Sequence, residues 1–556
     1  MKQLNREILS LAAPSILANI TVPLVGMADI AVAGHLGGGT GAAALIGGIT
    51  IGTMLFDLLY WNFAFLRSGT GGLTAQAYGQ LTARLQALNP PKAGSVTCSS
   101  TAPGPKSSKN GLRDVLTADQ VQAQRTTIAP TAHPVDQVQG ILLRALRIAM
   151  LSGVALIALQ WVVLWLAFLL VDCTPEVREL ASEYFKIRIW AAPATLSLFA
   201  FKGWFIGLQD TVKPMIADLL VNGLNILLSF GLGFGLCGLP AMGFAGVAAG
   251  TLIAQWCGFT YAAFAARHSL GQLVTQKTAF LGNQMTSGTA GDTKSAVFGL
   301  PAAPTVDQVQ QRPVDQVQAQ QSTAPSEPHP VDQVQQHPAD QEVQAPSFFR
   351  MNRDLVLRSL GMIAVYIGFT VISARFGDTM LAVSSILMKL LLVFSYFTDG
   401  FAYAGEALTG KFIGAGDKPG MHAAVKGCFI WGWGLAGAFM LLYGLGGVPA
   451  FHLLTSDATV VDAGREFIPW LLLMPLIGVP AFIWDGVFTG ATATSAMRDS
   501  TLLCAMGFFA VWFGGYYLAA TPPAGSTAIH ILMAAYFVHL AIRSIYLTIY
   551  WWRVKK

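Results

Sequence analysis

A single carboxylate, Asp29, lies inside the long apolar stretch from Ile8 to Ala33. A charge at the centre of a bilayer costs roughly 2.5–3.5 kcal/mol or more, so such residues face neighbouring helices or a water-filled cavity. Burial also favours the protonated form of a carboxylate. Asp29 is therefore our candidate for a group that takes up and releases a proton near neutral pH. The alternative is an aspartate that is hydrogen-bonded for packing alone.

Four further ionisable residues occupy apolar stretches of the second half: Lys389, Asp399, Glu406 and Asp485. Asp399 and Glu406 are seven residues apart, so they would share one face of a helix about two turns apart. We expect the four to line a polar cavity, because they are too many to serve packing alone. Binding substrate, carrying protons and fixing the structure are all roles open to them.

Arg67 also falls within an apolar stretch, and an arginine does not lose its charge in a protein. We predict that it joins the polar residues of the first half. It could reach polar surroundings from the end of a tilted helix, or pair with Asp57. Pairing with Asp29 would stabilise the ionised carboxylate and oppose its role as a proton carrier.

Aromatic residues near these charges could supply a surface for an amphipathic cation. The candidates are Tyr60, Trp61, Phe63, Phe369, Phe394 and Tyr403.

Other chemistries lack support in the sequence. No phosphate-binding loop, Ser/His/Asp grouping or zinc-protease motif is present, and the nine histidines and six cysteines have no metal-ligand spacing. We expect no enzyme activity, no cofactor and no metal site. For Cys173 and Cys237 we favour two separate thiols, with a disulfide as the alternative.

The elements that must position these residues are transmembrane helices. Of the 556 residues 53% are hydrophobic and only 11% charged, whereas soluble domains carry about 25% charge. About 20 apolar residues span a bilayer as a helix, which predicts an all-α polytopic protein of about twelve helices. The expected spans are 8–33, 44–79, 141–171, 183–208, 214–236, 242–266, 355–376, 380–413, 422–447, 464–490, 501–519 and 526–552.

Basic residues predict the orientation, because they gather in cytoplasmic loops. They precede the first span, follow the last, and lie between spans two and three, six and seven, and eight and nine. Both termini are therefore expected in the cytoplasm, with the chain in the cytoplasmic (inner) membrane. The first span contains Asp29 and ends without a small-residue cleavage site, so we interpret it as a retained helix.

Two segments, 86–139 and 270–348, are rich in Pro, Gln, Ser, Thr and Ala and cannot bury a core. They repeat the phrase Val-Asp-Gln-Val-Gln, at 135–139, 306–310, 314–318 and 331–335. We predict disordered cytoplasmic inserts, either without function or serving as docking sites for a soluble partner. The predicted organisation is an amino-terminal lobe of 1–85 and 140–269, the insert 86–139, the linker 270–348, and a carboxy-terminal lobe of 349–556.

The two halves resemble each other. Leu73–Gly79 matches Leu408–Gly414 at an offset of 335 residues, and Trp204–Gly207 matches Val487–Gly490 at an offset of 283. The offsets differ by 52 residues, close to the length of the first insert. This agreement indicates a six-plus-six duplication, a design in which transporters place a site between the halves.

Several motifs together resemble the multidrug and toxic compound extrusion (MATE) family, and its branch similar to DNA-damage-inducible protein F. They are Ala13–Ser15, Gly26–Gly37, Phe65–Gly79, Gly207–Asp210, Asn222–Asn225, Ser395–Leu408 and Trp484–Thr492. The resemblance covers nearly everything except the two inserts. It implies twelve helices in two six-helix lobes, a central cleft and cation-coupled antiport.

The resemblance also implies roles for residues of the first lobe. Asp29 matches the first-helix aspartate that the family uses for proton coupling, and Asn222, Asn225 and Thr251 are the polar residues expected around it. Ser229 departs from the pattern, which has an aspartate at that position. Losing this carboxylate weakens the case for a Na⁺ site, because hard cations favour several charged oxygen ligands.

We therefore predict a monomeric antiporter that exports organic, amphipathic or cationic compounds and is driven by protons rather than Na⁺. It would contact lipid and small molecules but no nucleic acid. A lipid-linked precursor flippase is the alternative within the same broad fold group; such proteins favour a more basic cavity, and here buried acids outnumber bases in the predicted sites. A transport-inactive scaffold that uses the repeated inserts is a second alternative.

Overall fold

The computed structural model describes residues 2–36, 42–88, 134–170, 173–289, 348–454, 458–518, 523 and 525–555. The chain divides into a compact unit of residues 1–273 and 345–556 and a second unit of residues 274–344. Every site discussed below belongs to the first unit. The expected inserts fall largely outside the described residues, as do the three later copies of the repeated phrase.

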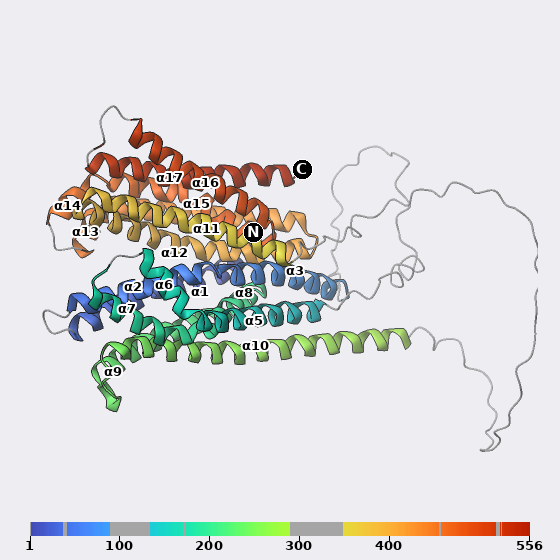
Figure 1. Ribbon diagram of the computed structural model, residues 1–556. Helices are drawn as coiled ribbons and strands as arrows, with labels where there is room; N and C mark the ends of the chain where they lie inside the picture. The colour runs from blue at the N-terminus through green and yellow to red at the C-terminus, as the bar shows by residue number, and fades with distance from the viewer. Residues whose placement is uncertain are drawn as a thin grey trace, which may run out of the picture. The chain divides into compact units, whose positions relative to one another are not determined.

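The first half of the chain forms helices α1 to α10, drawn from blue to green in Figure 1. Their bounds are α1 Lys2–Leu36, α2 Ala42–Trp61, α3 Ala64–Leu88, α5 Pro134–Ala158, α6 Gln160–Leu170, α7 Pro175–Arg188, α8 Ala192–Gly207, α9 Val212–Phe234 and α10 Phe244–Thr289. The second half forms α11 to α17, drawn from yellow to red. Their bounds are α11 Phe348–Ser373, α12 Asp378–Gly414, α13 Lys418–Leu454, α14 Ala458–Arg465, α15 Ile468–Gly490, α16 Thr494–Tyr517 and α17 Gly525–Lys555.

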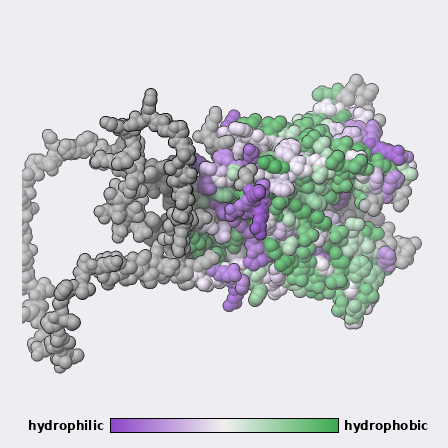
Figure 2. All heavy atoms as spheres, turned by 180° about the vertical axis from the view of Figure 1, so that it is seen from behind, coloured by the Kyte–Doolittle hydropathy of each residue, from purple (hydrophilic) through white to green (hydrophobic). Residues whose placement is uncertain are grey.

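Twelve segments of the described chain are helical, long and apolar enough to cross a membrane. α2 with α3 and α7 with α8 each make one of them. Helices satisfy their own backbone hydrogen bonds, which lipid cannot do. Figure 2 shows apolar residues over most of the visible face and hydrophilic residues gathered towards its ends. The predicted multi-pass helical fold is confirmed.

Each half has its own apolar core. In the first half, Phe56, Tyr184 and Phe185 are fully or nearly fully buried together, and a second cluster surrounds Trp204. In the second half one larger cluster is built mainly from α11 to α17, and Ile8, Leu11 and Ala12 of α1 also join it. The halves meet where α1 and α3 pack against α12. Charged residues that lie near α12 from either side are therefore candidates for contacts between the lobes.

Close contacts between equivalent helices reveal the duplication. In the first lobe, a Cβ added to Gly203 would overlap the backbone oxygen of Arg67 on the neighbouring α3. In the second lobe, a Cβ added to Gly486 would overlap the backbone oxygen of Ala402 on α12. Gly203 and Gly486 differ by 283 residues and Arg67 and Ala402 by 335, the two offsets found in the sequence. Each lobe therefore has a glycine at the equivalent position, and in each lobe this glycine lets the neighbouring helix approach closely.

The predicted bounds of the inserts need correction. α5 begins at Pro134, so residues 134–139 belong to a helix and not to the insert. Val135 and Val138 are buried, and Trp204 Nε1 donates a 3.1 Å hydrogen bond to the Val138 backbone oxygen. α3 continues to Leu88 and α10 to Thr289, both beyond the predicted starts of the inserts. Their polar composition led us to assign these helix ends to the inserts. Polar residues are tolerated where a helix leaves the membrane, so composition alone does not mark the end of a helix there.

Replacing Val138 with aspartate is expected to destabilise the protein by at least about 2 kcal/mol, because a charge would enter an apolar core without a partner. The neighbouring Gln139 is exposed, so Gln139→Asp serves as the matched control and should have little effect. Thermal unfolding of the purified variants measures the difference. Equal stability would show that this first copy of the repeat is not part of the core.

Cys173 and Cys237 are both free thiols in the structure, as we favoured.

Candidate functional site

Asp29 is only 5% exposed on α1, and a chain of polar side chains leads away from it. Ser229 on α9 donates from Oγ to Asp29 Oδ1 at 3.0 Å and also lies 3.2 Å from Asn225 Oδ1. Asn225 Nδ2 in turn donates to Thr251 Oγ1 on α10 at 2.9 Å. A chain of neutral hydrogen-bonding groups from α9 and α10 thus begins at the carboxylate on α1. Such a site can hold either protonation state of Asp29.

Asn222 does not join this chain. Its Nδ2 donates to Thr21 Oγ1 at 2.6 Å and links α9 to α1 one turn away from Asn225. The structure therefore brings together Ser229, Asn225 and Thr251 around Asp29, and gives Asn222 a contact between helices.

A basic residue that the sequence analysis missed, Arg188, interacts electrostatically with both Asp29 and Asp57. It ends α7, where its guanidinium donates to the Tyr184 hydroxyl at 3.0 Å and lies 4.8 Å from the centre of the Phe56 ring. Its position inside a predicted span was a usable signal, the same one that identified Asp29. With Arg188 nearby, the negative charge of Asp29 does not stand alone in its lobe.

Arg67 is not part of the amino-lobe network, so that prediction is wrong. Its Nη1 lies 3.1 Å from Glu406 Oε2 on α12, in the other lobe. Its guanidinium also lies 4.7 Å from the centre of the Tyr403 ring and donates to Ser68 Oγ at 2.9 Å. It pairs with neither Asp29 nor Asp57, because α3 turns this residue towards α12. Arg67 is a contact between the lobes.

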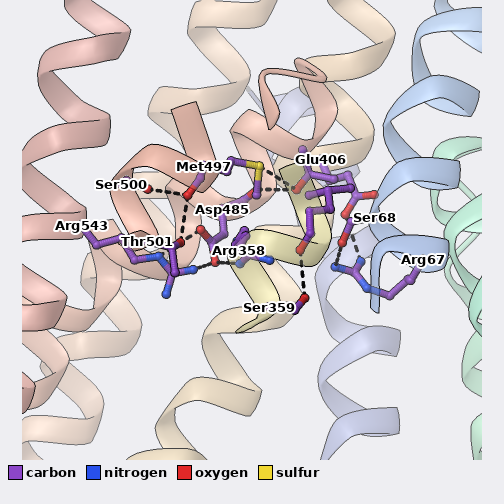
Figure 3. A network of polar contacts seen from close by, with 12 residues as sticks. Arg67, Ser68, Arg358, Ser359, Glu406, Asp485, Met497, Ser500, Thr501 and Arg543 are labelled. Carbon is purple, nitrogen blue, oxygen red and sulfur yellow. Dashed lines mark hydrogen bonds and ion pairs between the residues drawn. The ribbon is translucent and has the colours of Figure 1, made fainter. Parts of the chain in front are cut away.

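Asp485 on α15 is held between two arginines (Figure 3). Arg358 Nη2 of α11 lies 2.5 Å from its Oδ2, and Arg543 of α17 contacts both carboxylate oxygens, with Nε 3.2 Å from Oδ1. Arg543 is 2% exposed. The sequence analysis did not single out Arg358, whose side chain is only 14% exposed within the lobe. Arg543 stands in the last apolar span, where a charge should have drawn attention.

The interior holds more basic residues than we expected. Asp399 interacts electrostatically with four cations, namely Arg67, Lys202, Arg358 and Arg543. Lys202 comes from α8 of the first lobe and forms a 2.7 Å ion pair with Asp218. The polar centre between the lobes is therefore mixed in charge.

Three of the four ionisable residues of the second half share one set of cations. The arginines that pair with Glu406 and Asp485 also interact electrostatically with Asp399. Glu406 is 0% exposed and faces α3, and Asp485 is enclosed by its arginines. Lys389 is exposed and interacts electrostatically with Asp57, which is also exposed, on α2 of the other lobe. Lys389, Asp399 and Glu406 thus have different partners although all three lie on α12, and Asp399 is the one that interacts with all four cations of the mixed centre.

The predicted aromatic surface is only partly accessible. Phe369 and Phe394 are 1% and 0% exposed in the core of the second lobe, and Tyr60 is buried in the core of the first. These three are corrected to core residues. Trp61 is 43% exposed and packs edge-on against Tyr366 of the other lobe at 5.2 Å.

The remaining two, Phe63 and Tyr403, are half-buried. The Tyr403 ring already faces the protein's own cations, since the Lys202 amine lies 5.9 Å from its centre in addition to Arg67. A cationic compound at this ring would have to compete with both.

Comparison with known proteins agrees with this architecture. Residues 131–230 and 355–513 match the model of the MatE family. DNA damage-inducible protein F of Escherichia coli K12 is 29% identical over 544 residues, covering 98% of this chain and 91% of that protein. A protein of Thermotoga maritima named "Probable multidrug resistance protein NorM" is 32% identical over 120 residues, 21% of this chain and 26% of that protein.

Among solved structures, a MATE protein in the bent conformation superimposes with a TM-score of 0.65 at 14% identity. The match covers 98% of this chain and 94% of that one. At this identity the superposition concerns the fold alone.

Proposed function

This chain belongs to the MATE family of membrane transporters, and we propose that it is a multidrug efflux transporter that works as a proton-coupled antiporter. The observation that carries the choice of ion is the site around Asp29. Asp29 accepts a hydrogen bond there from Ser229, and Asn225 and Thr251 continue this chain of neutral side chains. Arg188 interacts with Asp29 electrostatically but forms no ion pair with it among the described contacts. A Na⁺ ion favours several charged oxygen ligands, whereas a proton needs one carboxylate and neutral partners that suit both of its states.

In the proposed cycle, proton entry from outside neutralises Asp29 and favours release of the exported compound. Return to the inward-facing state releases the proton and admits the next substrate. Moving one charge through about 100 mV supplies roughly 2.3 kcal/mol, enough for about a 50-fold gradient. The substrates we propose are organic and amphipathic, and the protein acts as a monomer in the cytoplasmic membrane with both termini inside.

The mixed charge around Asp399 favours a second candidate, transport of a lipid-linked precursor. Four cations within electrostatic reach of one acid would accommodate an anionic headgroup better than an acidic cavity would. This candidate uses the same lobes and the same cleft but a different cargo.

Transport by the purified protein in sealed vesicles distinguishes these functions. We expect efflux of a fluorescent amphipathic cation when a proton gradient is imposed, and no efflux with a Na⁺ gradient alone. A strict requirement for Na⁺ would overturn the choice of ion. Movement of a labelled polyprenyl phosphate between leaflets, without efflux of any soluble dye, would favour the second candidate. Empty vesicles and vesicles without a gradient serve as controls.

A further inference from the structure

The end of α3 and the end of α12 meet in a reciprocal contact across the two lobes. A Cβ added to Gly79 on α3 would overlap the backbone oxygen of Lys411 on α12. A Cβ added to Gly414 on α12 would overlap the backbone oxygen of Gln76 on α3. Gly79 with Gly414, and Gln76 with Lys411, are both 335 residues apart. The two lobes therefore exchange the same contact, as self-complementary surfaces do around a two-fold axis.

Further contacts extend this seam, which we define as the α3 residues 71–79 and the α12 residues 406–414. Gly410 would meet Ala75 near the centre of the reciprocal contact. Gln76 Nε2 donates to the Gly490 backbone oxygen at 3.0 Å and to Thr492 Oγ1 at 3.2 Å. Glycines allow the backbones to approach this closely, which is how helices associate without a hydrophobic driving force in lipid.

At the first position of the seam the two lobes carry different residues, and there the seam carries an ion pair. Where α12 has Glu406, α3 has Gly71, 335 residues earlier. The missing side chain of Gly71 leaves the space that Glu406 fills, since a Cβ at Gly71 would overlap Glu406 Oε1. Glu406 then reaches Arg67 one turn away. The carboxylate is 0% exposed, and its Oε1 has no hydrogen-bond partner among the described residues.

Separation of α3 from α12 would leave a buried carboxylate without its arginine. Removing one partner of a buried ion pair is costly because the other charge remains uncompensated. On the preceding parts of the same two spans, Asp57 and Lys389 interact electrostatically but stay exposed. The lobes are thus tightly packed along the seam, and they are packed less tightly where the preceding residues Asp57 and Lys389 lie.

We propose that the α3–α12 seam is the closing face of the transport cycle, held shut by the paired glycines and by the Arg67–Glu406 ion pair. The proposal rests on the proposed function, since it assigns residues to one step of alternating access. The ion pair and the glycines act as positioning residues, which hold the lobes together and contact no substrate.

Spin labels at Arg84→Cys on α3 and Lys418→Cys on α13, both exposed positions, report the distance between the lobes. The six native cysteines are replaced in this background. Gly79→Val and Gly414→Val should each raise the ratio of long to short distances about tenfold or more, because a side chain there meets backbone. Gly437→Val on α13 is the matched control, since nothing lies within 4 Å of an added Cβ there. Alanine at positions 79 and 414 provides milder variants if valine prevents folding.

The ion pair is tested in the same way. Glu406→Gln should raise the long-distance population about tenfold or more. The control is Glu7→Gln, which removes the other described ion pair between the lobes, from Glu7 on α1 to Lys411 on α12 at 2.6 Å. Glu7 is 30% exposed in that pair, so its loss should change the ratio less than about twofold.

Equal shifts from Glu406→Gln and Glu7→Gln, or a Gly79 variant that behaves like Gly437→Val, would overturn the proposal. These distances are measured without substrate or gradient. A protein that shows the expected distance shifts but exports nothing would refute the proposed function and support the role of the seam. Efflux by a protein whose distances do not change in the variants would support the proposed function and refute the role of the seam.

Discussion

Replacing Asp29 with asparagine is expected to abolish the substrate gradient that vesicles build up under an imposed proton gradient. Asparagine has nearly the same size and can still hydrogen-bond to Ser229, so the fold should persist. It cannot exchange a proton, and the roughly 50-fold gradient available from about 100 mV should fall towards none. Dye accumulation or efflux, followed over time after the gradient is imposed, gives the result directly.

The control for this variant is Glu179→Gln, which removes an exposed acid from α7 of the same lobe. It should transport like the wild type. Passive exchange of labelled substrate without a gradient should continue in Asp29→Asn if only the coupling is lost. Full gradient-driven efflux by Asp29→Asn would refute proton coupling through this residue.

Replacing Asp485 with asparagine is expected to lower the free energy of unfolding by about 3–5 kcal/mol, the usual cost of leaving a buried charge unpaired. Arg358 and Arg543 would then lie side by side, and Arg543 is almost fully buried. Hydrogen bonds from the neutral amide would recover only part of the loss. Thermal unfolding of the purified protein in detergent, followed by size-exclusion chromatography, measures the change.

Asp462→Asn is the matched control for stability. This aspartate pairs with Arg465 on α14 of the same lobe at 3.6 Å, but its side chain is 72% exposed. An exposed pair contributes at most about 1 kcal/mol, so the unfolding temperature should hardly move. If both variants unfolded at the same temperature, the prediction would be wrong, and other groups would have to balance the charges of Arg358 and Arg543.

Much of the fold followed from the sequence, because each membrane helix is specified by its own apolar run. The twelve spans and the duplication could be found without any knowledge of packing. The offsets of 335 and 283 residues that indicated the duplication recur in the structure, where Gly203 and Gly486 make equivalent contacts. The ends of helices were less certain: the start of α5 at Pro134 depends on burial of Val138 against Trp204, which composition does not reveal.

The site around Asp29 was predictable in part for the same local reason. A lone carboxylate in an apolar run must find polar partners, and Ser229, Asn225 and Thr251 are polar residues of apolar helices in the same lobe. Arg188 is likewise a charged residue within an apolar run, and the sequence analysis overlooked it. Three of the six aromatic candidates are core residues, because an aromatic side chain suits a core as well as a cleft.

The sequence by itself determined that this protein is a duplicated bundle of membrane helices with a few charges inside it. Only the tertiary structure decided which charges meet. Arg67 and Glu406 are 339 residues apart, and their pairing depends on the angle at which α3 crosses α12 and on the space that Gly71 leaves. Hydropathy is a property of each segment alone, whereas an ion pair depends on two segments and on the packing that brings them within about 4 Å.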